Sequence, residues 1–440
     1  MQPLEVPALK PDLSSRLVDR SPVPYAYVVL LVAFVTTMMT VPGQTLGVSV
    51  FLDSIIEDLD VTRSTVSLLY TAGTLVGSFV LPWVGRFIDA RGPRLAVGLI
   101  AAAFSVATVY MSLVNGLWML AIGFVLIRGL GQGSLSLVSL HVVNLWFVRR
   151  RGLAVGVTGL GMAFATVVFP GFIETLIAGF GWRGAYAWLG VMVAVLALPL
   201  GVTFFRDQPE RYGALPDGRR EAVADAPSAG TAYEAVPERH VTLAEARRTR
   251  AFWTIVAGDA AVAAFSTGLV FHHYDLMAQS GLTRVEAATV FVPLGLITAF
   301  ALLTGGALMD RVRPRFMLAA MLVLQAAALL MAGAVPLWLA PFYGAAIGLT
   351  QGMKGAISGA IYATYFGRRY LGAIRGTAST IGVAGTAVGP LVFAVALDAS
   401  GSYWPALIGT AVVSGLLAAA SLTLKPPVES EPGEGPLGAA

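Results

Sequence analysis

The sequence has no cysteine and few charged residues. Without cysteine the chain can form neither disulfides nor thiolate metal sites, and thiol catalysis is excluded. Charged residues make up only 12% of the 440 residues, about half the share that is usual in a soluble domain. Hydrophobic residues make up 56%, and the mean hydropathy is +0.76. These values indicate a polytopic membrane protein and argue against a soluble enzyme.

Long apolar segments recur along the chain. A helix that spans a bilayer needs about 20 mostly apolar residues, and segments of this kind predict an all-α protein with twelve transmembrane helices. The predicted spans cover residues 25–50, 64–86, 94–113, 117–147, 152–180, 183–205, 251–278, 284–309, 315–334, 338–366, 373–399 and 402–424. The 49 glycines suit the close packing of such helices in lipid.

Polar segments divide these spans into two groups of six. The expected domains are a cytoplasmic tail (1–24), a six-helix bundle (25–205), a cytoplasmic linker (206–250), a second six-helix bundle (251–424) and a disordered tail (425–440).

Basic residues are unevenly shared between the two sides of the predicted membrane. With the N-terminus inside, twelve arginines lie in short inner loops: Arg86, Arg91, Arg94, Arg149, Arg150, Arg151, Arg311, Arg313, Arg315, Arg368, Arg369 and Arg375. The outer loops hold three, namely Arg63, Arg183 and Arg284. This asymmetry predicts a plasma (inner) membrane protein with both termini cytoplasmic. The high isoelectric point then reflects topology and needs no nucleic-acid partner.

The two halves repeat each other in sequence. "GRFIDARGPR" (85–94) returns as "GALMDRVRPR" (306–315), and "GLGQG" (129–133) returns as "GLTQG" (348–352). "WFVRR" (146–150) and "YFGRR" (365–369) follow in the same order. Two six-helix halves in parallel repeat are the plan of a large class of transporters.

The loop after the second span carries residues that resemble the signature of the major facilitator superfamily. They are Gly85, Asp89, Arg91, Gly92 and Arg94, with a second copy at Gly306, Asp310 and Arg311. The resemblance implies the twelve-helix fold of that family and a latch made by Gly85, Asp89, Arg91, Arg94, Asp310 and Arg311. In such a latch Gly85 allows close helix contact, and Asp89 pairs with arginines or a helix N-terminus. The alternative is a solvated loop that only sets topology.

Three further stretches are similar to the monocarboxylate and oxalate:formate porters of the superfamily. They are "PGQTLGVSVFLDSI" (42–55), "RGLGQGSLSL" (128–137) and "GVAGTAVGPLVF" (382–393). This resemblance implies a small organic anion as the substrate.

Two basic residues, Arg128 and Lys354, lie well inside predicted spans. A charge there costs about 2.5–3.5 kcal/mol on insertion scales, so each is a candidate site residue. Lys354 has no counterpart in the first half, where Leu135 takes its place. Arg128 could instead be structural, tied to backbone carbonyls or to Glu174.

Polar residues at helical spacing accompany both bases, on spans 4 and 10, and also follow spans 1 and 7. The resemblance to the major facilitator superfamily implies that spans 1, 4, 7 and 10 line the central cavity. The candidate substrate-binding residues are Lys354, Arg128, Gln44, Gln132, Gln351, Ser358, Tyr362 and His273. The candidate coupling residues are Asp259 and His272. On span 7, Asp259, Ser266 and His273 are seven apart, and Asp259 could pair with Lys354 across the cavity.

Arg128, Lys354 and Asp259 give the predicted cavity a net charge of +1, which favours an anion. The predicted function is secondary active transport of a monocarboxylate-like anion by alternating access, with protons as a possible coupling partner. The alternatives are a proton-driven exporter of amphipathic compounds and a transporter-like solute sensor. We expect a monomer in the lipid bilayer, without cofactor, metal or catalytic residues.

Overall fold

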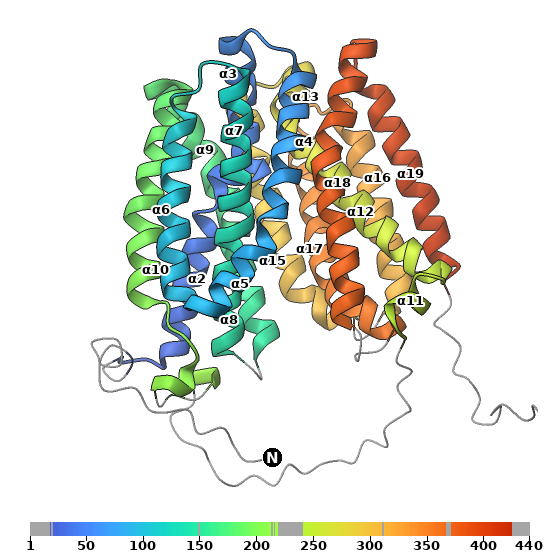
Figure 1. The fold of residues 1–440 in the computed structure, drawn as a ribbon. Helices are drawn as coiled ribbons and strands as arrows, with labels where there is room; N and C mark the ends of the chain where they lie inside the picture. The colour runs from blue at the N-terminus through green and yellow to red at the C-terminus, as the bar shows by residue number, and fades with distance from the viewer. Residues whose placement is uncertain are drawn as a thin grey trace, which may run out of the picture.

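The computed structural model describes residue 18 and residues 21–147, 150–212, 214, 216–218, 241–309, 312–366 and 371–424. These residues form helices and connecting turns, with no strand among them. Asp310 and Arg311 of the second signature copy lie outside the described residues. The helices stand side by side in two groups, which we call the N half (α2–α10) and the C half (α12–α19) (Figure 1).

The N half begins with a helix that is interrupted near its middle, and several of its later helices are interrupted too. Its elements are α2 (Tyr25–Met38), the 3₁₀ turn η1 (Val41–Gly43), α3 (Thr45–Leu59), α4 (Arg63–Phe79), α5 (Leu81–Arg91), α6 (Pro93–Met111), α7 (Leu117–Ile127), the π-helical segment η2 (Arg128–Leu135), α8 (Ser136–Trp146), α9 (Arg151–Met192), the π-helical segment η3 (Val193–Ala197) and α10 (Leu198–Phe204).

The C half follows a similar order of helices. After the short helix α11 (Leu243–Ala246) come α12 (Arg250–Phe271), α13 (His273–Gln279), α14 (Arg284–Thr289), α15 (Phe291–Met309), α16 (Pro314–Ala332), α17 (Ala340–Phe366), α18 (Leu371–Ser400) and α19 (Trp404–Leu422).

These helices make the all-α, multi-span architecture that the hydropathy pattern predicts. Within the described residues, nine helices are long and apolar enough to cross a membrane. The long element α9 contains two of the predicted spans, and its helical backbone is interrupted between them at Gly181, which has φ 66°. Glycine adopts that left-handed conformation without a side-chain clash, and the break falls between the spans predicted at 152–180 and 183–205.

Corresponding helices pack in the same way in both halves. In the N half, α4 packs against α7 and η2, and in the C half α15 packs against α17 in the same way. Similarly, α2 packs against α9 in the N half, and α12 packs against α18 in the C half. The halves meet chiefly where α9 lies against α15 and α4 lies against α18, with further contacts of α3 with α12 and α13 and of α9 with α14. Small residues allow these close contacts: a Cβ on Gly389 of α18 would overlap the backbone carbonyl of Ala264 of α12.

The two ends of the bundle differ. One end, which we call the linker end, carries η4 (Pro209–Tyr212), η5 (Pro216–Gly218) and α11. Parts of the predicted linker fold against both halves there: the Trp146 indole donates to the Arg206 carbonyl oxygen at 3.2 Å, and the Val241 amide donates to the Phe366 carbonyl oxygen at 3.1 Å. The opposite end, which we call the far end, carries the C-terminus of α3 together with α13 (Figure 1).

Candidate substrate-binding site

The first and fourth spans of the N half are both irregular where they meet. Span 1 changes from α2 to α3 through the 3₁₀ turn η1, and span 4 changes from α7 to α8 through the π-helical segment η2. A Cβ on Gly43 would overlap the carbonyl oxygen of Ile127, so the turn presses directly on the start of η2. Interrupted helices that line an interior site are a recurring feature of transporter binding sites, and π-helical turns are frequent at functional sites.

The π geometry changes which residues of span 4 share a face. The hydroxyls of Ser134 and Ser136 donate to carbonyl oxygens five residues earlier, at Gly129 and Gly131, over 2.8 and 3.5 Å. Spacings of three and four therefore do not keep Arg128, Gln132 and Ser136 on one line. Further along, Ser139 is buried and shares a 2.8 Å hydrogen bond with Thr36 of α2, a contact between packed helices.

Arg128, the first residue of η2, is only 3% exposed. Its Nε donates to the Thr74 hydroxyl at 2.9 Å, and its Nη1 donates to the Gly43 carbonyl oxygen at 3.0 Å. Its guanidinium carbon lies 4.5 Å from the centre of the Tyr70 ring. The third nitrogen, Nη2, is buried and has no hydrogen-bond partner among the described residues. No described carboxylate lies within 4.0 Å of this arginine.

Tyr70, which packs against the Arg128 guanidinium, lies at the boundary between the halves. Its hydroxyl shares a 2.7 Å hydrogen bond with Thr45, the first residue of α3. Its ring lies 4.5 Å from that of Phe271, the last residue of α12 in the C half. Arg128 is therefore separated from the C half by one aromatic side chain.

Span 10 is a continuous helix, α17, and places Lys354 near its middle. Lys354 is half-buried, and its ammonium has no hydrogen bond or ion pair with any described residue. The predicted partner, Asp259 of α12, accepts a 2.8 Å hydrogen bond from Ser358, one turn further along α17. The structure thus brings Asp259 and Ser358 together, as expected for facing spans, and leaves Lys354 unpaired. Tyr362 is buried, and its hydroxyl lacks a partner in the described part of the chain.

The three predicted glutamines are all half-buried. Gln44, at the end of the η1 turn, donates to the Thr40 hydroxyl at 3.0 Å. The side-chain amides of Gln132 and Gln351 make no hydrogen bond to any described residue and remain available to a ligand.

Span 7 does not form the single polar stripe that a spacing of seven predicts. Ser266 is buried and donates to Gln325 of α16 at 2.7 Å, within the C half. His272 interrupts the helix (φ −95°, ψ 12°), and its Nε2 lies 2.8 Å from the Pro390 carbonyl oxygen. His273 bonds the Ala287 carbonyl oxygen at 2.9 Å and stacks on Tyr343. Both histidines are thus packed between helices at the far end.

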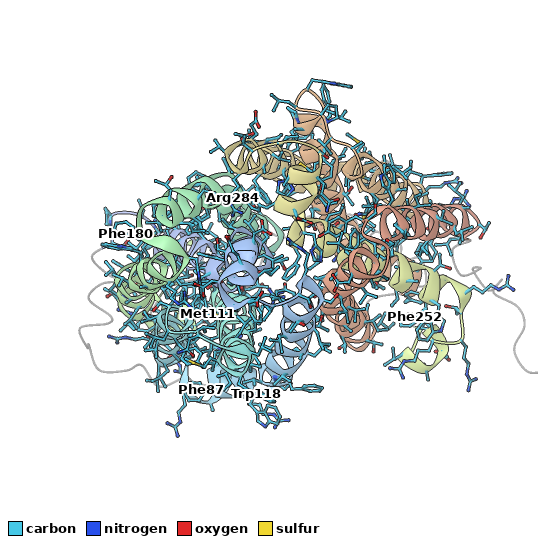
Figure 2. All side chains as sticks on the ribbon, turned by 90° about the horizontal axis from the view of Figure 1, so that it is seen from above. Phe87, Met111, Trp118, Phe180, Phe252 and Arg284 are labelled. Carbon is cyan, nitrogen blue, oxygen red and sulfur yellow. The ribbon has the colours of Figure 1, made fainter. Side chains whose placement is uncertain are left out.

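A network of ion pairs at the far end joins the halves, and the sequence did not indicate it. Arg284 of α14 pairs with Glu174 of α9 at 2.8 Å and with Asp53 of α3 at 3.0 Å. Arg63 pairs with the same Asp53 at 2.7 Å and with Asp275 of α13 at 3.2 Å. Figure 2 shows Arg284 where the two halves meet. Glu174, which the sequence offered as a possible partner of Arg128, therefore binds Arg284 instead.

The predicted latch lies at the linker end. A Cβ on Gly85 would meet no atom within 4 Å, so the expected close helix contact is absent in this conformation. Arg91 is exposed, and the Arg94 Nε donates to the Val202 carbonyl oxygen of α10 at 2.9 Å. Gly92 has φ 80°, and a Cβ there would overlap the carboxylate of Asp207. Arg94 and Gly92 thus hold the signature loop to the end of the sixth span.

The family follows from a comparison with known sequences. A model of the Major Facilitator Superfamily matches residues 26–311, well over half of the chain. The chain belongs to the major facilitator superfamily. This is a family of membrane transporters rather than of enzymes, and its members include solved structures with the same fold.

One such structure is that of a bacterial homologue of the human lysosomal transporter Spinster, in an inward-facing and occupied conformation. It superposes with a TM-score of 0.61 over 91% of this chain and 95% of that one. The identity is 19%, so this likeness concerns the fold.

Curated relatives match parts of the chain. The oxalate:formate antiporter of Oxalobacter formigenes is 24% identical over 168 residues, which are 38% of this chain and 40% of the relative. Monocarboxylate transporter 6 of Mus musculus is 28% identical over 185 residues, 40% of this chain and 37% of the relative. The alignments thus span about two fifths of the length of these relatives.

Proposed function

We propose that this member of the superfamily transports a small, monocarboxylate-like organic anion by alternating access, with Arg128 and Lys354 as the residues that bind it. The observation that carries the proposal is the environment of Arg128: its guanidinium is buried, and among the described residues one of its nitrogens has no partner and no carboxylate lies within 4.0 Å. A buried charge without a counter-charge is costly, and a bound carboxylate would supply both the charge and the hydrogen-bond acceptor.

The arginines of the ion-pair network at the far end show the contrast. Arg63 and Arg284 each bind two carboxylates, whereas Arg128 and Lys354 bind none among the described residues. In this conformation Asp259 is engaged by Ser358 and leaves Lys354 available. The names of two relatives, an oxalate:formate antiporter and a monocarboxylate transporter, agree with an anionic substrate for this chain too.

Coupling to protons is assigned to Asp259, the carboxylate that faces span 10 inside the C half. A carboxylate in lipid-buried protein is a common proton carrier in transporters. Protonation changes the charge around Lys354 and so changes the affinity for an anion. Such a difference in affinity between conformations is what coupling requires.

The linker end is assigned to the cytoplasm in the plasma (inner) membrane, with both termini on that side. Arg86, Arg91 and Arg94 lie at that end, whereas Asp53, Asp58 and Asp60 lie at the far end. An excess of basic residues marks the cytoplasmic side. On this assignment the ion-pair network closes the outer side, and transport requires that it open.

The test is uptake of labelled lactate, formate and oxalate into proteoliposomes, with and without an inward proton gradient. Accumulation of at least one anion by the wild type, and its loss in Lys354→Ala, are expected. Wild-type uptake by the variant would remove Lys354 from the site. Uptake of none of these anions, in vesicles that contain folded protein, would overturn the proposed substrate class.

A further inference from the structure

A cavity of about 1130 Å³ lies at the linker end of the C half, apart from the candidate site between the halves. It is lined mainly by α11, the first turn of α12 and the C-terminal end of α19. Figure 2 shows Phe252, of that first turn, toward the outer side of the C half, away from the boundary at Arg284. All of its lining residues belong to the end of the linker and to the C half, so the cavity lies apart from the path between the halves.

One side of the cavity is basic. Arg247, Arg248 and Arg250 line it together with one acid, Glu245, which leaves a net charge of +2. All three arginines are exposed, and within the described residues none of them has an ion-pair partner. The Glu245 carboxylate accepts hydrogen bonds from the backbone and hydroxyl of Thr242 at the start of α11. The Arg247 Nη2 also donates to the Thr377 hydroxyl at 3.4 Å, and the remaining guanidinium donors can bind an anion from outside the chain.

The other side of the cavity is apolar and includes one exposed aromatic side chain, that of Trp253. Ala251, Trp253, Ala420 and Leu424 form this wall. Trp253 is 49% exposed, and its indole nitrogen donates to the Arg247 carbonyl oxygen at 2.7 Å, which fixes the ring beside the arginines. Tryptophan is enriched where helices leave the bilayer, and α12 is an apolar helix of spanning length. The cavity therefore joins a cationic rim to a lipid-facing wall.

We propose that this cavity binds the phosphate headgroup of an anionic phospholipid from the leaflet at the linker end. Arg247, Arg248 and Arg250 contact the phosphate, and Trp253 packs against the glycerol and the first part of an acyl chain. Arginine forms paired hydrogen bonds with phosphate oxygens, and basic pockets at the ends of membrane helices bind lipid headgroups. The apolar wall favours a lipid over a free phosphate ion. This site is independent of the transported substrate.

The test measures the melting temperature of the full chain in detergent against increasing phosphatidylglycerol, phosphatidylcholine and inorganic phosphate. Phosphatidylglycerol is expected to raise the melting temperature, whereas phosphatidylcholine and phosphate leave it unchanged. The triple variant Arg247→Gln/Arg248→Gln/Arg250→Gln should need about a hundredfold more phosphatidylglycerol for the same effect, because each basic residue contributes about 1 kcal/mol. Arg248→Gln alone, at an exposed position without an ion pair, should show part of this loss.

The matched control is Arg149→Gln/Arg150→Gln/Arg151→Gln, which removes the same charge from a cluster in the N half. It should respond to phosphatidylglycerol as the wild type does. If both triple variants lost the stabilisation by phosphatidylglycerol to the same extent, the effect would come from non-specific electrostatic attraction of the lipid to basic residues. That result would overturn the proposed site. An equal effect of inorganic phosphate would assign the arginines to a free anion, and no response of the wild type would refute lipid binding altogether.

Discussion

The guanidinium of Arg284 lies 2.8 Å from the carboxylate of Glu174, and this pair joins the two halves of the protein at the far end. Arg284 also binds Asp53, which in turn binds Arg63, so that one carboxylate of the N half connects two arginines. The pairs that cross between the halves, Arg284 with Glu174 and Asp53 and Arg63 with Asp275, must separate if the far end is to open. The network therefore sets part of the free-energy difference between the two access states.

Arg284→Gln is expected to shift the protein toward a state that is open at the far end. Loss of a partly exposed pair of this kind contributes about 1 kcal/mol, or roughly a fivefold change in the ratio of states. The measurement is the distance between spin labels at Glu57→Cys and Ala278→Cys, which lie on opposite halves. The chain has no native cysteine, so only these two sites are labelled.

Arg183→Gln is the matched control for Arg284→Gln. Arg183 pairs with Asp58 at 2.6 Å, an ion pair at the same end but within the N half. Its loss should leave the spin-label distances unchanged. Equal shifts in both variants would show that the inter-half pair has no special part in closure.

Arg128→Gln is expected to abolish anion transport without lowering the melting temperature. The substitution removes a buried charge that has no described counter-charge, and that charge is itself destabilising. Thr74→Val makes the opposite change, because it keeps the charge and removes the acceptor of Nε. It should cost about 1–3 kcal/mol of stability and retain transport. A destabilised Arg128→Gln that still transports would make Arg128 a structural residue.

Asp259→Asn is expected to separate coupling from binding. The amide oxygen can still accept the hydrogen bond from Ser358, so the local structure is kept while the titratable group is lost. Accumulation driven by a proton gradient should disappear, and exchange of anion down its own gradient should remain. Ser358→Ala keeps the carboxylate and should remain gradient-driven. Unchanged accumulation by Asp259→Asn would exclude this residue as the proton carrier.

Gly85→Ala tests the latch that the signature motif predicts. Nothing lies within 4 Å of the added methyl group in this conformation, and alanine is favoured over glycine in a helix by about 1 kcal/mol. The melting temperature should hold or rise. If Gly85 packs closely in the other access state, transport should still fall. Gly171→Ala, also in open space, serves as the control, and wild-type transport by Gly85→Ala would argue against a latch there.

The fold was largely predictable because long apolar segments, glycines between helices and arginines in loops can each be recognised from neighbouring residues in the sequence. The predicted boundary near residue 181 coincides with the backbone break at Gly181. The candidate site was less predictable because helical periodicity fails where a helix is irregular. The π geometry of η2 changes the phase between Arg128 and Ser136, and the break at His272 does the same between Ser266 and His273.

The ion-pair network could not be derived from spacing at all. Arg284 and Glu174 are 110 positions apart and lie in different halves. Their pairing depends on how the two bundles are placed against each other. The only signal in the sequence was the location of Arg63, Arg284 and several acids on the same predicted side of the membrane, which is consistent with pairing but does not select partners.

The most direct test of the binding account is a thermal-shift titration of purified protein with small carboxylates. The account predicts that at least one monocarboxylate stabilises the wild type, that Lys354→Ala and Arg128→Gln each weaken this effect, and that amphipathic cations have no effect. Stabilisation of both variants to the wild-type extent, or of the wild type by amphipathic cations alone, would contradict it.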